Sequence, residues 1–152
     1  MNKPDDISEL KQTIAELFST QQLAVLSSFG NEQPYASLVA FAATEDLKHI
    51  IFATTRSTRK YANLSSESKV ALLIDNRTNT QNDFSHAVAA TALGSAEEIR
   101  DSERTSCLDI YLRKHPYLKE FVSSPSCALL RVKIQQYYVV SRFQNVQELH
   151  IQ

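Results

Sequence analysis

The sequence predicts a single domain, residues 1–152, in which six to seven antiparallel strands form a β-barrel with flanking helices, an α+β fold. Three observations lead to this prediction. Short apolar runs follow one another through short turns, as expected for antiparallel strands. Other segments repeat their apolar residues at helical spacing. The 152-residue chain is long enough to bury a real core, and no repeat, linker or low-complexity segment divides it.

The first part of the chain predicts one helix followed by three strands. Asp5 and Asp6 precede apolar residues at helical spacing and suit the positive end of a helix dipole, which predicts a helix over residues 6–20. The apolar runs that follow are separated by short turns, and this arrangement favours an antiparallel meander. Its strands are expected at residues 23–29, 34–43 and 49–54, with turns at Gly30-Asn31 and at residues 44–48.

The middle of the chain contains one ambiguous segment. Residues 69–75 predict a strand and the polar residues 76–85 predict a loop. The alanine-rich residues 87–98 favour a strand, but alanine is a poor strand former and a helix remains an alternative. Small side chains in a strand can mark the close approach of a planar ligand or a partner subunit. They are equally expected in a strand beneath a covering helix.

The last part of the chain predicts two helices and a long strand. Residues 100–114 form a helical pattern that His115-Pro116 interrupts, and residues 117–122 resume it as a short helix. Residues 126–134 then predict a strand, which residues 137–140 extend or follow. The tail from residue 144 gives no clear prediction.

Composition excludes several classes of function. A net charge of −1 argues against a nucleic-acid-binding protein, which would carry a basic face. No apolar run approaches membrane length and the first residues lack the apolar core of a signal peptide, so a cytoplasmic location is expected. The two cysteines, Cys107 and Cys127, stand apart from each other and are expected to be buried thiols. The histidines show no metal-ligand spacing, so no metal site is expected at His49, His86, His115 or His150.

The segment over residues 52–64, FATTRSTRKYANL, has the features of a phosphate site. A strand delivers the hydroxyl groups of Thr54 and Thr55, and Arg59 and Lys60 then open a helix. Amides at a helix start point toward an anion, and arginine and lysine add charge to the site. The chain has only two glycines, which excludes the glycine-rich phosphate loops. The alternative is an ordinary strand–helix connection with two solvated cations.

This segment also carries a resemblance to a known family. Phe52-Ala53-Thr54-Thr55-Arg56-Ser57-Thr58-Arg59-Lys60, then Asn63-Leu64 and a strand from Lys69, resembles the motif of the pyridoxamine 5'-phosphate oxidase-like, FMN-binding split-barrel superfamily. The similarity extends over about residues 23–140. It implies an FMN-binding split barrel and a homodimer that holds two FMN molecules in grooves between the subunits.

The resemblance also implies roles for individual residues. Arg59 and Lys60 would bind the phosphate of FMN, and the hydroxyl groups at Thr54, Thr55 and Thr58 would assist. Three further residues would contact or approach the flavin ring: Ser37, Asn76 and Arg77. Ser37 is equally expected to be an ordinary polar residue on a strand, and Arg77 an ordinary loop cation.

Departures from the family motif bear on the reaction. Ala53 replaces the usual aromatic residue before the threonine, and the chain has no tryptophan, a residue of the oxidases' C-terminal substrate segment. Oxidation of vitamin B6 is therefore not expected. The first hypothesis is an FMN-dependent oxidoreductase acting on an unknown small molecule, with NADH or NADPH as a possible reductant. No catalytic acid or base stands out.

Two alternatives remain open. The first is a flavin-binding module that stores or senses flavin without turnover. The second is heme binding or degradation, because residues 34–42 and 137–143 are similar to the heme-utilisation branch of the same superfamily. The candidate axial ligands for heme are His86, His115 and His150, each of which could instead be a surface or capping histidine.

Overall fold

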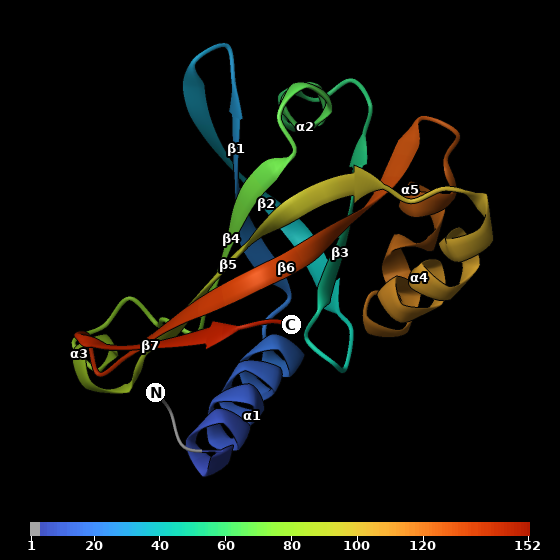
Figure 1. Ribbon diagram of the computed structural model, residues 1–152. Helices are drawn as coiled ribbons and strands as arrows, with labels where there is room; N and C mark the ends of the chain where they lie inside the picture. Colours follow the sequence, from blue (N-terminus) through green and yellow to red (C-terminus); the bar gives the residue numbers. More distant parts are fainter. Residues whose placement is uncertain (1–3) are drawn as a thin grey trace.

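The computed structural model describes residues 4–152 and confirms a barrel of antiparallel strands with helices around it (Figure 1). In this part of the chain no helix is long and apolar enough to cross a membrane. The elements in chain order are α1 (Pro4–Thr20), β1 (Leu23–Gly30), β2 (Gln33–Ala43), β3 (His49–Thr55), α2 (Arg59–Ser66), β4 (Lys69–Asp75), α3 (Asp83–His86), β5 (Val88–Glu98), α4 (Asp101–Lys114), the 3-10 helix η1 (Pro116–Leu118), α5 (Lys119–Ser123), β6 (Cys127–Ser141) and β7 (Asn145–His150).

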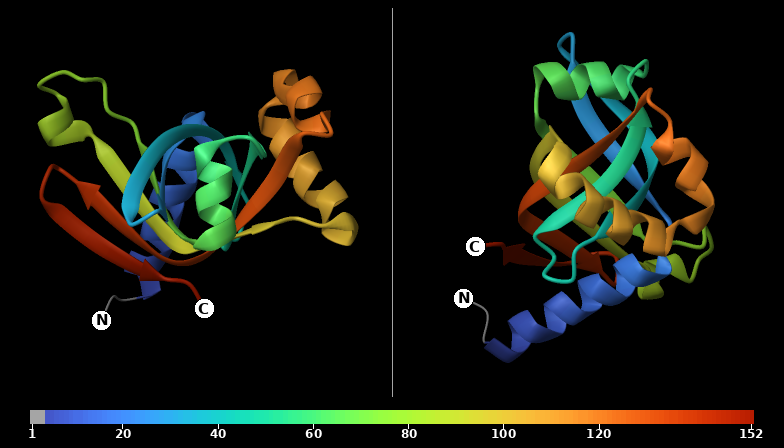
Figure 2. Two further views of the ribbon diagram at one scale, coloured as in Figure 1. Left: turned by 90° about the horizontal axis from the view of Figure 1, so that it is seen from above. Right: turned by 90° about the vertical axis from the view of Figure 1, so that its right-hand side faces the viewer.

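The barrel closes through one long-range strand pair. The sheet order is β3-β2-β1-β4-β5-β6-β7, and β3 also pairs with β6, so six strands form a closed ring and β7 lies outside it on β6. All strand pairs are antiparallel. Seen from above, α2 lies across one opening of the ring (Figure 2). α1 packs against the other end.

Successive side chains along each strand point alternately into and out of the barrel, and the inward-pointing apolar ones fill its interior. In β4, for example, Val70, Leu72 and Ile74 are buried and the residues between them are more exposed. The interior cluster also receives Leu10, Ile14, Leu17 and Phe18, the apolar face of α1. The buried hydroxyl of Tyr137 donates to the carbonyl oxygen of Leu47 at 2.6 Å. This bond ties β6 to the turn between β2 and β3.

A second, smaller apolar cluster lies on the outside of the barrel. α4, η1 and α5 cover the outer faces of β2 and β3 there, and both predicted thiols, Cys107 and Cys127, are buried in it as expected. His115 ends α4 as its C-cap and is buried, with its Nε2 2.7 Å from the carbonyl oxygen of Phe41. These three helices therefore cover one side of the barrel only (Figure 2).

The hairpin between β1 and β2 requires a glycine at one position. Asn31 and Glu32 both have positive φ and form the turn, so the turn lies one residue later than the predicted Gly30-Asn31. A Cβ atom at Gly30 would collide with the side-chain oxygen of Asn63, which is buried and donates through Nδ2 to Ser28 Oγ at 3.1 Å. Glycine thus allows α2 to pack onto the hairpin.

Most predicted elements are confirmed, and the structure settles two open points and adds two elements. Residues 88–98 form a strand and not a helix, and β6 is one strand that includes residues 137–140. The predicted loop over residues 76–85 contains the short helix α3, which a polar sequence of this kind does not reveal. The tail forms β7, which pairs with β6. The sequence of the tail alone does not predict this strand, because strand formation depends on the hydrogen bonds to its partner.

Lys114 joins α4 to α1 and gives a prediction for the pH dependence of stability. Its ammonium donates to the carbonyl oxygen of Phe18 at 2.8 Å, in the last turn of α1, and lies 3.7 Å from the ring centroid of Phe41. Burial lowers the pKa of Lys114 to about 8, below about 10.4 for an unfolded lysine. The unfolded chain therefore binds more protons between these values, and stability gains from this residue as the pH rises.

We expect the free energy of unfolding of the wild type, relative to that of Lys114→Met, to rise by about 1–2 kcal/mol from pH 7 to pH 10, after allowance for partial solvent screening. Urea unfolding of both proteins across this range measures the difference. The comparison with the variant cancels the opposite contribution of Cys127, because burial raises the pKa of that thiol. A constant difference would show that Lys114 titrates as in the unfolded chain.

Candidate functional site

The start of α2 is fixed by a chain of hydroxyl groups. Thr58 is the N-cap, and its Oγ1 accepts from the amide of Tyr61 at 3.3 Å and donates to the carbonyl oxygen of Thr55 at 3.0 Å. Thr54 is buried, and its Oγ1 lies 2.9 Å from that of Thr58. The third hydroxyl, on Thr55, lies 3.4 Å from Ser57 Oγ. The strand end and the helix start are therefore held together by the predicted threonines.

Arg59 and Lys60 are the first two residues of α2, and their charges are uncompensated. Within residues 4–152 neither side chain has a carboxylate within ion-pair distance, and their two amides have no acceptor. The guanidinium carbon of Arg59 lies 5.6 Å from the ring centroid of Tyr35 on β2. Two donating amides, two cations and the positive end of a helix dipole thus meet at one place.

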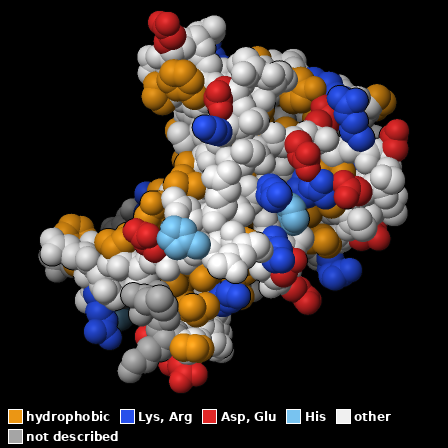
Figure 3. All heavy atoms as spheres, viewed as in Figure 1, with side chains coloured by type: hydrophobic (Ala, Val, Ile, Leu, Met, Phe, Trp, Pro, Cys, Tyr) orange, Lys and Arg blue, Asp and Glu red, His pale blue; other side chains and the backbone are white. Residues whose placement is uncertain are grey.

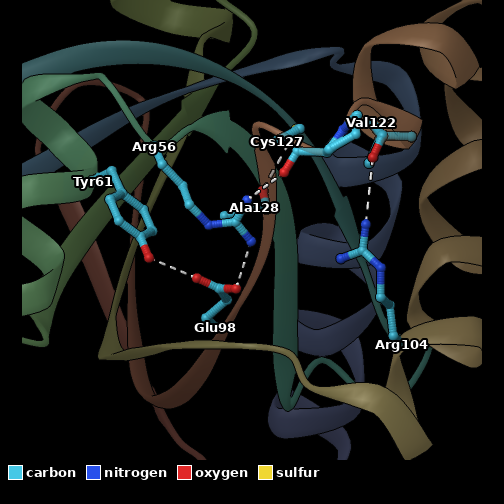
Figure 4. A network of polar contacts seen from close by, with 8 residues as sticks. Arg56, Tyr61, Glu98, Arg104, Val122, Cys127 and Ala128 are labelled. Atoms are coloured by element: carbon cyan, nitrogen blue, oxygen red, sulfur yellow. Dashed lines mark hydrogen bonds and ion pairs between the residues drawn. The ribbon is translucent and has the colours of Figure 1, made fainter.

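A neighbouring arginine is neutralised. Arg56 Nη2 lies 2.9 Å from a carboxylate oxygen of Glu98, whose other oxygen accepts from the hydroxyl of Tyr61 at 2.7 Å (Figure 4). Arg56 also donates to the carbonyl oxygen of Pro125 at 2.8 Å. Burial raises the pKa of Glu98, but the hydrogen bonds from Arg56 and Tyr61 outweigh this effect and hold the pKa below its usual value.

Sequence reasoning missed this network. Arg56 and Glu98 are separated by 42 positions, and only the folded barrel brings them together. The one available signal is that the segment FATTRSTRK holds three cations, of which the resemblance assigns two. Because Glu98 neutralises Arg56, the two assigned cations, Arg59 and Lys60, are the ones in this segment whose charge is uncompensated within residues 4–152.

The other predicted site residues lie elsewhere in the subunit. Ser37 pairs with Leu26 in register, and its Oγ is buried without a partner among the described residues. Asn76 follows the far end of β4, where its Oδ1 accepts from the amide of Val88 at 2.7 Å. Arg77 Nε lies 3.0 Å from Asp75. One subunit thus brings together the threonines, Arg59 and Lys60, and leaves Asn76 and Arg77 at the opposite end of the barrel.

The candidate heme ligands are also dispersed. His115 is buried rather than exposed; burial lowers its pKa, so the ring is neutral. Its Nε2 donates to Phe41, which leaves Nδ1 buried without a partner among residues 4–152. His86 is exposed in α3, and His150 is exposed beside Glu148 at 3.3 Å. In the same residues no group of three or more histidine, cysteine, aspartate or glutamate side chains is placed to hold a metal ion.

Comparisons with solved structures support the split-barrel fold. A heme-binding protein from Mycobacterium smegmatis matches with a TM-score of 0.82 at 15% identity, over 99% of this chain and 60% of that protein. Campylobacter jejuni ChuZ matches with a TM-score of 0.79 at 10% identity, over 99% of this chain and 61% of ChuZ. An FAD-binding protein from Mesorhizobium loti matches with a TM-score of 0.67 at 12% identity, over 84% and 91% of the two chains. These identities establish the fold alone.

Comparisons of sequence establish the family. Among curated proteins no sequence matches significantly. The model of the family described as pyridoxamine 5'-phosphate oxidase matches residues 10–141, which include every strand of the closed barrel and the segment with Arg59 and Lys60. The chain therefore belongs to the pyridoxamine 5'-phosphate oxidase family.

Proposed function

We propose that this protein binds FMN through its phosphate at the start of α2 and acts as a flavin-dependent oxidoreductase on a small molecule. The observation that carries the proposal is the pair of uncompensated cations, Arg59 and Lys60, beside two amides without acceptors in the described chain. A phosphate monoester presents two negative charges and several acceptor oxygens. It would satisfy all four groups at once.

The surrounding residues would give this site its shape. Thr54 and Thr58 hold the end of β3 against the start of α2, and the bonds of Arg56 to Glu98 and Pro125 fix the loop between them. A preformed cradle binds a phosphate without first ordering its own loop. When bound, flavin supplies hydride and electron transfer, and the protein supplies binding and orientation.

A homodimer is the second part of the proposal, and an uncovered face of the barrel supports it. Two rows of neighbouring residues cross β2, β1, β4 and β5 on the outside, and none is charged. One row is Leu38, Val25, Leu73 and Thr91; the other is Ala36, Ser27, Ala71 and Leu93. We call these eight residues the open face. Four of the eight side chains are small, those of Ser27, Ala36, Ala71 and Thr91, and they suit the close approach of a second subunit.

The shape of the molecule is consistent with this use of the open face. The outline in Figure 3 is hollowed on the left, between the projecting β1–β2 hairpin and the projecting region of α3 and the β6–β7 turn. Leu38 on this face is 63% exposed. A symmetric dimer could bring Asn76 and Arg77 of one subunit toward the flavin that the other subunit holds. Their contact with flavin, that of Ser37 and a cytoplasmic location remain predictions.

Turnover separates an oxidoreductase from a non-catalytic flavin-binding module. With FMN bound, we expect NADH or NADPH to bleach the flavin absorbance under anaerobic conditions and air to restore it. Stable flavin absorbance over hours with both nucleotides and with a panel of small reductants would favour storage or sensing.

Heme binding is the competing proposal, because the Mycobacterium smegmatis neighbour is described as heme-binding. The structure gives it less support than FMN. The buried His115 already donates to Phe41, and His86 and His150 lie on the surface without neighbouring ligands. A Soret band on heme titration that disappears in His86→Ala or His150→Ala would favour heme over FMN.

A further inference from the structure

A second hollow lies at the end of the barrel away from the phosphate site. It has a volume of about 550 Å³ and lies between α1, α4 and the turn that joins β2 to β3. The start of α2 is at the other end of β3, because this strand runs from the turn toward Thr55. The hollow, which we call the α1–α4 cleft, is thus separate from the proposed FMN site.

The walls of the α1–α4 cleft are mainly apolar. Alanine methyl groups form much of the lining, so the space between the two helices stays unfilled. The longer apolar walls are Phe18, Leu47 and Ile110. The three alanines are Ala15 on α1 and Ala42 and Ala43 at the end of β2.

The helices on either side are anchored by other faces. α1 buries Ile14 and Leu17 into the barrel, and Ala15 between them is exposed. α4 buries Cys107 and Tyr111, and Ile110 beside them is only partly covered. Packing of the two helices therefore does not require the cleft to close. An apolar ligand could enter it without displacing the core.

Cations gather on one side of this cleft. Lys114 and Arg113 both line it at the end of α4. Lys114 uses one N–H on the carbonyl oxygen of Phe18, which leaves two donors on its ammonium. Arg113 is exposed and has no ion-pair partner among residues 4–152. Glu45 is the only carboxylate in the lining, so the cleft carries a net positive charge.

We propose that the α1–α4 cleft is a binding site for a small amphipathic monocarboxylate, with its chain on the alanine floor and its carboxylate at Arg113 and Lys114. A planar guanidinium accepts a carboxylate with two parallel hydrogen bonds, and the nearby ammonium adds a third donor. A hydrocarbon chain would bury the apolar walls of the cleft, which stabilises the complex, whereas a free phosphate would leave these walls exposed to water. This site is independent of the proposed flavin function.

Titration with decanoate, followed by two-dimensional NMR of the ¹⁵N-labelled protein, tests the proposal. We expect saturable shifts confined to α1, α4 and the β2–β3 turn, with sub-millimolar affinity. Decanol should bind at least roughly tenfold more weakly, because it lacks the charge that Arg113 and Lys114 would pair. Equal binding of decanol, or shifts centred on α2, would overturn the assignment.

Two variants, each with a matched control, test whether decanoate binds in the α1–α4 cleft. Ala15→Leu fills the cleft from an exposed helix position and should abolish binding, whereas Gln12→Leu, exposed on the same helix outside the lining, should not. Arg113→Gln should weaken binding roughly tenfold, and Arg142→Gln should leave it unchanged. All four proteins should retain FMN like the wild type. Decanoate affinity that survives both Ala15→Leu and Arg113→Gln would refute the site even if FMN binds as proposed.

Discussion

Replacing Arg59 and Lys60 together by alanine is expected to abolish the retention of FMN and leave the fold intact. Both side chains lie at the start of α2 and form no ion pair within the described chain, so their removal costs the fold little beyond the contact of Arg59 with the exposed ring of Tyr35. Each would make charge-assisted hydrogen bonds to the phosphate. Their combined loss should cost about 4 kcal/mol, roughly a thousandfold in Kd. Fluorescence titration of FMN measures the change, because the free and bound flavin differ in emission.

A charge-matched control accompanies this experiment. Lys48→Ala with Lys119→Ala removes two exposed cations outside α2 and should bind FMN like the wild type. Circular dichroism and the urea midpoint should be similar for all three proteins. Wild-type FMN affinity in the folded Arg59→Ala, Lys60→Ala protein would exclude the start of α2 as the phosphate site.

The substitution Leu38→Lys should convert a dimer into a monomer. Leu38 is 63% exposed in the single subunit, so a lysine there would reach water and cost the subunit little. In a dimer formed through the open face the same ammonium would be buried without a partner. That burial costs several kcal/mol, which is expected to raise the dimer Kd by roughly 10³. Sedimentation at micromolar concentration distinguishes the two states.

Tyr117→Lys is the control for this prediction. Tyr117 is also a large exposed side chain, at 73%, but it lies in η1 on the side of the barrel that the helices cover. The variant should remain a dimer. A Leu38→Lys protein that sediments like the wild type would place the interface elsewhere. A wild-type protein that is monomeric at this concentration would refute the proposed homodimer.

Sequence patterns among near neighbours predicted most of the helices and strands. The features that they did not predict depend on pairing between strands far apart in the sequence. Alternation in segments such as residues 69–75 and short turns identified the strands, since both depend only on near neighbours. The pairing of β3 with β6, which closes the barrel, joins residues about 80 positions apart. β7 becomes a strand only because β6 offers it an edge.

The candidate site was predictable to a similar extent. Arg59 and Lys60 follow a strand within a few residues, so sequence spacing alone placed them at a helix start. The neutralisation of Arg56 by Glu98 depends on strands that meet only in the folded chain, so the local sequence shows a third cation but does not identify its partner. The separation of Asn76 from Arg59 likewise follows from the direction of β4, which carries the chain away from α2.

The most direct test of the account is an absorbance spectrum of the purified wild-type protein after addition of FMN and removal of the excess. We expect the flavin peaks to stay with the wild-type protein at one FMN per subunit and to be lost from the Arg59→Ala, Lys60→Ala variant. A folded wild-type dimer that retains no flavin would contradict the proposed function.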